Sequence, residues 1–143
     1  MKKLYTLGLY EKALPVDLSW EEKLKVAKES GYDFLEMSID ETEEKMARLD
    51  MSEIERLQLF CTAKKVGLPI RSLCLSCHRK YPFGSKSVMT RNKALELMEK
   101  AVVLAEGLGI CQIQLAGYDV FYEESDEQTK QYFLKNIKKA AEI

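Results

Sequence analysis

The feature that most constrains the fold is a regular alternation of short apolar runs with longer amphipathic segments. The apolar runs predict strands and the segments between them predict helices, in the order strand then helix, four times over. A glycine closes each of the first three predicted helices, and the next strand begins within two residues of it. This alternation predicts a parallel sheet covered by helices. The predicted strands are Tyr5 to Tyr10, Asp33 to Ile39, Leu68 to Leu75 and Ile110 to Leu115.

Capping signals mark where the helices begin. Ser19 is followed three residues later by Glu22, and Ser52 by Glu55, which is the pattern of a capping box at a helix start. Ser125 is expected to open the last helix, because a serine hydroxyl can accept a hydrogen bond from a free backbone N–H of the first turn. The sequence therefore gives three helix starts without reference to tertiary structure.

The loops on the two sides of the predicted sheet differ in length. Helix-to-strand connections are short, whereas residues 40–50 and 76–89 form long strand-to-helix loops, the first with room for one helical turn. Four parallel strands alone would suit a self-contained flavodoxin-like domain that binds a small ligand or a partner protein. Long strand-to-helix loops instead build the active site of a (β/α)8 TIM barrel. We expect the first four βα units of such a barrel, with the flavodoxin-like domain as the alternative.

The predicted last helix, from Glu127 to Ile143, carries no stop signal. Neither glycine nor proline occurs in it, so the helical pattern continues to the final residue. We therefore expect residues 1–143 to be the amino-terminal half of a single barrel domain, cut within its fourth helix by engineering or proteolysis.

The charge balance indicates no charged macromolecular partner. Lys and Arg number 22 against 23 Asp and Glu, which gives no electrostatic reason to expect nucleic acid or an anionic membrane as partner. The apolar start is too short and too interrupted for a signal peptide, and no run approaches the roughly 18 residues that span a bilayer. We expect a cytoplasmic protein whose four cysteines stay reduced.

The segment Cys74-Leu75-Ser76-Cys77-His78 is a literal C-x-x-C-H, the pattern of covalent haem attachment. Haem attachment takes place outside the cytoplasm, and Cys74 lies in a predicted strand, where side chains three residues apart point to opposite faces. The same geometry disfavours a zinc site, which would also need further ligands, and a redox pair at a helix start. We interpret the motif as coincidence.

Glu36 stands inside an apolar strand, where an ionised carboxylate is costly unless it is paired. We predict that it binds substrate. The structural alternative is a Glu held by Arg71 or by a salt bridge to a neighbouring strand.

Polar residues also follow the third and fourth predicted strands, where a barrel has its active-site face. His78 and Arg79 could orient a sugar hydroxyl or contact a phosphate, or could be held by backbone and solvent. Gln114 and Tyr118 suit the recognition of a polyol, whereas Gln112 could equally fill the barrel interior. We predict substrate contacts for His78, Arg79, Gln114 and Tyr118.

Several catalytic signatures are missing from the sequence. There is no glycine-rich phosphate loop and no G-x-S-x-G, and one histidine cannot supply a histidine-rich metal site. We therefore predict neither catalytic residues nor metal ligands within this chain, and expect it to be inactive by itself.

Several blocks of the sequence resemble the L-ribulose-5-phosphate/L-xylulose-5-phosphate 3-epimerases, sugar isomerases with a xylose-isomerase-like TIM barrel. The blocks occur in the family's order and cover all four predicted strands with their loops. They are GLYEKALP at 8–15, FLEMSIDE at 34–41, ARLD at 47–50, CLSCHR at 74–79, YPFGS at 81–85 and QIQLAGYDV at 112–120. Cys77 stands where the family more often has a small residue.

The resemblance implies a metal-dependent isomerase of pentose or ascorbate catabolism whose substrate is a small sugar phosphate. A divalent ion (Zn or Mn) would polarise the C2 carbonyl, and two carboxylates would remove and return the C3 proton through an enediolate. The resemblance places the metal ligands, both carboxylates and the phosphate grip on the later strands, outside these 143 residues. A hexulose-6-phosphate isomerase of the same barrel family is the alternative, and we expect a homodimer.

Overall fold

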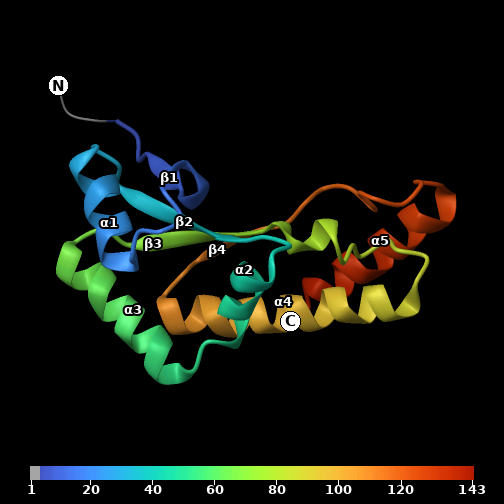
Figure 1. The fold of residues 1–143 in the computed structure, drawn as a ribbon. Coiled ribbons are helices and arrows are strands. Elements are labelled where there is room, and N and C mark those ends of the chain that lie inside the picture. The colour runs from blue at the N-terminus through green and yellow to red at the C-terminus, as the bar shows by residue number, and fades with distance from the viewer. Residues whose placement is uncertain (1–3) are drawn as a thin grey trace.

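The strands form one parallel sheet in which spatial order follows chain order. We describe residues 4–143 in a computed structural model. The strands are β1 (Gly8–Tyr10), β2 (Phe34–Ile39), β3 (Ile70–Leu75) and β4 (Gln112–Gln114), and their order is β1-β2-β3-β4 (Figure 1). A flavodoxin-like sheet would place β1 between β2 and β3. The observed order is that of a barrel segment and excludes the flavodoxin-like alternative.

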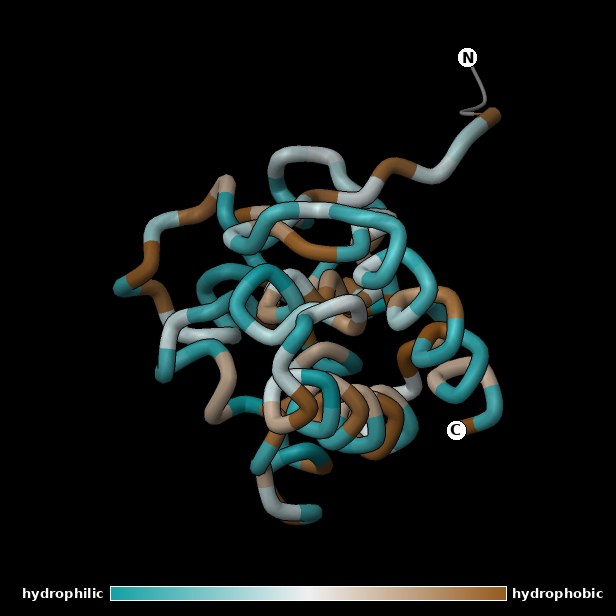
Figure 2. Tube along the Cα trace, turned by 90° about the vertical axis from the view of Figure 1, so that its right-hand side faces the viewer, coloured by the Kyte–Doolittle hydropathy of each residue, from teal (hydrophilic) through white to brown (hydrophobic). Residues whose placement is uncertain are grey.

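Four long helices pack side by side in the order in which they follow the strands. They are α1 (Trp20–Glu29), α3 (Glu53–Val66), α4 (Val88–Leu108) and α5 (Glu127–Ala140). Each contacts the next, and α3 and α4 run below the sheet in Figure 1. Polar and apolar segments alternate along the helices in Figure 2, as expected where one side of each helix is buried. Within residues 4–143, no helix combines the length and apolarity that crossing a membrane requires.

The hydrophobic core lies between the sheet and the helices. On β2, Leu35, Met37 and Ile39 are completely buried, and Leu73 and Leu75 of β3 join them in one apolar cluster with residues of the helices. Side chains alternate between the two faces of a strand, so the residues between these point to the other face. That second face carries polar side chains, among them Glu36 and Ser72.

The predicted helix starts hold in two cases of three. Both capping boxes are present, Ser19 with Glu22 and Ser52 with Glu55. Ser125 as the opening residue of the last helix is wrong. Asp126 is the N-cap, because its carboxylate accepts a hydrogen bond from the Thr129 backbone N–H at 2.9 Å.

Other differences lie where local signals are weakest. The loop 40–50 contains the helix α2 (Glu43–Ala47) and a 3-10 turn, Arg48–Asp50, which is more helix than the single turn expected. The strands β1 and β4 are shorter than predicted, because each pairs with only one neighbour and part of its length finds no partner. The helix α5 ends at Ala140 rather than Ile143.

One prediction follows from the two open sheet edges. Because β1 and β4 present unpaired backbone groups, residues 1–143 expressed alone should self-associate. On a sizing column we expect an apparent mass above 16.5 kDa that rises with concentration. Q112K/Q114K, which places charge on the β4 edge, should shift the chain toward the monomer.

V103K is the control, since Val103 lies on the helix α4 rather than on a strand and is 48% exposed. It should elute like the wild type. A chain that is monomeric at every concentration would contradict the prediction.

Candidate functional site at the carboxyl ends of the strands

A row of polar side chains crosses the open face of the sheet. In the strand register Tyr10 lies opposite Glu36, Glu36 opposite Ser72, and Ser72 opposite Gln112. The Ser72 hydroxyl donates to the Glu36 carboxylate at 2.7 Å. Glu36 is therefore held by Ser72, whereas the alternative partner Arg71 lies over the Phe34 ring, at 6.0 Å. The carboxylate is oriented, half-buried and open to the sheet face.

A second row lies nearer the carboxyl ends of the strands. Ser38 is opposite Cys74, and Cys74 opposite Gln114. The Tyr10 hydroxyl connects the two rows, because it lies 3.1 Å from the Ser38 hydroxyl. Gln114 lines hollows next to both rows, one with Glu36 and one with the loops beyond the strands.

The hollow at the strand ends brings three of the five predicted substrate-binding residues together. It has a volume of about 240 Å³ and is lined by Arg79, Gln114 and Tyr118 with Cys74 and Ser76. Arg79 comes from a 3-10 turn after β3, Ser76–Arg79, and Tyr118 from the loop after β4. Glu36 lies one row deeper in the sheet. These residues form the candidate site.

His78 does not line this hollow. Its side chain is buried, at 3% exposure, with Nε2 3.1 Å from the Ala94 carbonyl oxygen and its ring 4.4 Å from the Phe83 ring. Burial lowers its pKa to about 4, so the imidazole is neutral at pH 7. The Ser76–Arg79 turn directs His78 toward α4 and Arg79 toward the hollow. His78 therefore packs in the interior against Ala94 and Phe83.

The loop that carries Tyr118 is tied down by its neighbour Asp119. The Asp119 carboxylate accepts hydrogen bonds from Ser125 and Thr129, and its carbonyl oxygen accepts one from the Gly84 N–H at 3.0 Å. A Cβ at position 84 would lie 2.5 Å from that carbonyl oxygen, so only glycine allows the two loops to approach so closely. The loops after β3 and β4 are thereby fixed to each other.

Glu11, a residue not predicted from the sequence, is 1% exposed and directly follows β1. Lys23, Lys45 and Arg48 surround it, with nitrogen–oxygen distances of 3.1, 2.6 and 2.6 Å. The Ser38 backbone N–H donates to the same carboxylate at 3.0 Å. Burial alone would raise the pKa of Glu11, but the hydrogen bonds from Arg48, Lys45 and Ser38 outweigh it and lower the pKa to about 2.

Local pattern gave only a weak signal for this cluster. The sequence shows only that an acidic residue, Glu11, directly follows a predicted strand. Its three cationic partners come from segments that are distant in sequence and that the fold brings together. The adjacent residue, Lys12, forms an ion pair with Asp40 at 2.8 Å and links the ends of β1 and β2 once more.

The cysteines of the C-x-x-C-H segment have different environments. Cys74 is on β3 and lines the hollow, whereas Cys77 is completely buried in the turn that follows. Burial raises the pKa of the Cys77 thiol to about 12. Among residues 4–143, no three His, Cys, Asp or Glu side chains come together as a metal-binding group.

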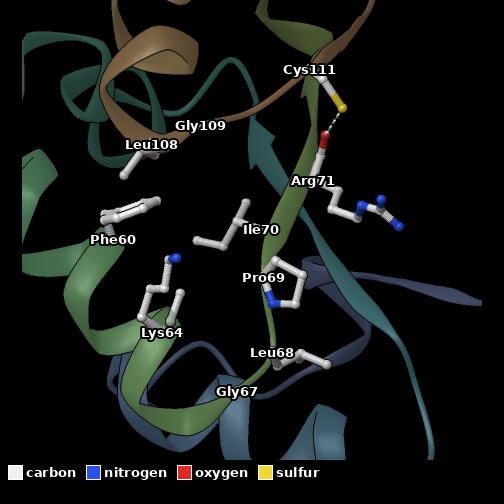
Figure 3. Close-up of a pocket in the computed structure, with 11 residues that line it drawn as sticks. Phe60, Lys64, Gly67, Leu68, Pro69, Ile70, Arg71, Leu108, Gly109 and Cys111 are labelled. Atoms are coloured by element: carbon white, nitrogen blue, oxygen red, sulfur yellow. Dashed lines mark hydrogen bonds between the residues drawn. The ribbon is translucent and has the colours of Figure 1, made fainter.

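A second pocket, of about 470 Å³, lies at the opposite end of the sheet (Figure 3). Phe60 and Lys64 of α3 face Pro69 at the start of β3, and Leu108 and Cys111 complete the lining. This pocket is at the amino ends of β3 and β4, the end of a barrel where conservation serves stability and not chemistry. It is not part of the candidate site.

Comparison with known proteins agrees with this fold. The xylose isomerase-like TIM barrel family matches residues 24–143. The chain is 51% identical over 138 residues to a protein of Escherichia coli strain K12 provisionally named L-ribulose-5-phosphate 3-epimerase, covering 96% of this chain and 48% of that one. The L-ribulose-5-phosphate 3-epimerase of Shigella boydii serotype 18 is 45% identical over 143 residues, 100% of this chain and 50% of its own length. The chain spans about half the length of the curated relatives it matches.

Solved structures with the same arrangement include D-psicose 3-epimerase, crystallised in the presence of D-fructose. It superposes with a TM-score of 0.75 at 14% identity, over 96% of this chain and 48% of that one. A likeness at this identity shows the fold alone. Together with the strand order, it confirms the prediction of about four βα units of a TIM barrel.

The Glu11 cluster generates a stability prediction. E11Q leaves three buried cations without their anion, so the free energy of unfolding should fall by about 3–5 kcal/mol in urea titrations at pH 7. E21Q is the control, since Glu21 pairs with Lys25 at the surface and its loss should hardly move the midpoint.

The same cluster should be visible in the pH dependence. The folded pKa of Glu11 is about 2 against an ordinary value of 4.5, so its contribution is complete above pH 4.5 and is lost as pH falls toward 2. The difference between wild type and E11Q should shrink over this interval. A constant difference would contradict the assignment.

The cysteines generate a reactivity prediction. Cys61 and Cys111 are exposed and should react rapidly with Ellman's reagent at pH 8, whereas Cys77 should react only on unfolding. C61S should remove one fast equivalent and C77S none. If C77S had one fast-reacting thiol fewer than the wild type, the Cys77 thiol would be accessible in the folded protein.

Proposed function

This chain belongs to the xylose isomerase-like TIM barrel family, and we propose that the protein is an L-ribulose-5-phosphate 3-epimerase. The observation that carries the proposal is the 45–51% identity to relatives of that name, over 96–100% of this chain. This name also favours the epimerase over the hexulose-6-phosphate isomerase alternative. The reaction would interconvert L-ribulose 5-phosphate and L-xylulose 5-phosphate in pentose or ascorbate catabolism.

Residues 1–143 would be the amino-terminal half of one barrel domain. Inversion at C3 needs a base that removes the proton and an acid that returns one to the opposite face, through an enediolate. The described residues place one oriented carboxylate, Glu36, on the open face of the sheet. We assign it to substrate binding and assign both proton-transfer carboxylates to the second half of the barrel.

The substrate-binding residues are then Glu36, Arg79, Gln114 and Tyr118. Glu36 accepts hydrogen bonds only, Gln114 both donates and accepts, and the Tyr118 hydroxyl does either, which suits a chain of sugar hydroxyl groups. All four lie on the open face or at the strand ends. The position of His78 gives no support to the substrate contact predicted for it.

The cofactor would be a divalent ion, Zn or Mn. Its ligands would lie on the later strands, outside this chain, as the family resemblance implies. The near-zero charge balance leads us to propose a cytoplasmic protein that binds neither nucleic acid nor membrane. A homodimer is a separate part of this proposal.

The direct test uses the full-length protein with L-ribulose 5-phosphate in D₂O. Epimerisation by proton removal should form L-xylulose 5-phosphate and place deuterium at C3, measured by NMR in the presence of Mn²⁺ or Zn²⁺. Hexulose 6-phosphate is the control substrate, and an isomerase would act on it by moving the carbonyl. A well-folded protein that leaves C3 unlabelled with several divalent ions would overturn the proposal.

A further inference from the structure

The pocket of Figure 3 lies at the opposite end of β3 from the candidate site, and the proposed reaction makes no use of it. Its volume of about 470 Å³ falls within the roughly 300–1,000 Å³ that is usual for small-molecule sites. The lining comes from α3, from the start of β3, and from the segment that joins α4 to β4. The first half of the barrel therefore forms this pocket from its own residues.

Most of the pocket lining is apolar. The Ile70 side chain points toward the Phe60 ring, and Leu108 and Pro69 lie to either side of them (Figure 3). Phe60 is only half-buried, so part of its apolar surface is open to a ligand. A ligand with an apolar body would gain free energy by removing this surface from water.

Lys64 brings a positive charge into this apolar pocket. Its ammonium points inward, 5.4 Å from the centre of the Phe60 ring (Figure 3). In the part of the chain that the structure describes, no carboxylate pairs with Lys64, and neither Asp nor Glu lines the pocket. The next residue, Lys65, does have an anion, since it lies 3.8 Å from the Glu21 carboxylate. The charge of Lys64 is thus free to attract an anionic ligand.

The carboxyl ends of α3 and α4 also lie beside the pocket, and their carbonyl groups carry partial negative charge. These carbonyl groups are already engaged. Backbone N–H groups of the residues after each helix donate to the last turns. The Lys28 ammonium donates to the Val66 carbonyl oxygen at 2.5 Å. The helix ends therefore do not need Lys64 as a partner.

We propose that this pocket binds a small amphipathic carboxylate, with the carboxylate on the Lys64 ammonium and the apolar body against Phe60 and Ile70. Such a ligand supplies the anion that Lys64 lacks and covers the open apolar surface at the same time. One charge-assisted hydrogen bond and a few apolar contacts correspond to a Kd of about 10 μM to 1 mM. The site is distinct from the proposed epimerase site and does not depend on that function.

The experiment titrates the full-length protein with 3-phenylpropionate by calorimetry. 3-Phenylpropanamide has the same shape without the charge, and 3-phenylpropylamine carries the opposite charge. The carboxylate should bind most tightly of the three, and K64M should weaken its binding about 10-fold while leaving that of the amide unchanged. K64R should retain binding, because it keeps a cation at this position.

Two other cations provide matched controls. K65M removes the neighbouring charge on the same helix, and R71M removes a guanidinium that points to the other side of β3 in Figure 3. Both variants should bind 3-phenylpropionate like the wild type. Binding that K64M does not weaken, an amide that binds as tightly as the carboxylate, or an amine that binds more tightly would overturn the proposal.

The thiol of Cys111 reports where the probe binds. Cys111 is exposed and lines the pocket, whereas Cys61 is exposed on α3 outside the lining. With 3-phenylpropionate at about ten times its Kd, Ellman's reagent should react with Cys111 about 10-fold more slowly and with Cys61 at an unchanged rate. Peptide mass spectrometry identifies the modified cysteine. Equal protection of both thiols, or protection of Cys61 alone, would place the probe elsewhere and overturn the site.

Discussion

The buried carboxylate of Glu11 is the interaction on which the arrangement of the first two βα units depends. It joins the end of β1 to Lys23 of α1, Lys45 of α2, Arg48 of the following turn and the backbone of β2. A buried carboxylate is tolerated only when cations and hydrogen-bond donors surround it, so the segments that supply these groups are held in one geometry. Trp20 adds an aromatic surface, 4.7 Å from the Arg48 guanidinium carbon. The loops after β1 and β2 start from a rigid base as a result.

The two faces of the sheet have different roles. One face, with Leu35, Met37 and Leu73, is buried against the helices and supplies the apolar surface that holds the layers together. The other carries an almost uninterrupted row of groups that can donate or accept hydrogen bonds. A strand such as β2 serves both because its side chains alternate, so Glu36 can face the open side between two completely buried neighbours.

Structural features that depend on residues close together in the sequence were predictable, whereas features that depend on distant residues were not. Ser52 and Glu55 lie three residues apart and hydrogen-bond to each other whatever surrounds the helix, so the capping box was predictable. The same holds for Gly67 and Gly109, whose left-handed conformations end α3 and α4. Glu11 could not be placed, since its partners lie 12 to 37 residues away. The sequence likewise did not reveal that α3 leaves Ile54 and Leu57 exposed, because packing selects which face of a helix is buried.

The short 3-10 turn after β3 makes the length of this segment as important as its composition. Successive residues of a 3-10 helix are about 120° apart around its axis, so His78 and Arg79 leave it in different directions. Inserting or deleting a single residue here would rotate the imidazole away from Ala94 and the guanidinium away from the hollow, with no change in the chemistry of either side chain. Natural variation in this loop should therefore occur by substitution, and a designer who wishes to enlarge the loop has to add residues after Lys80.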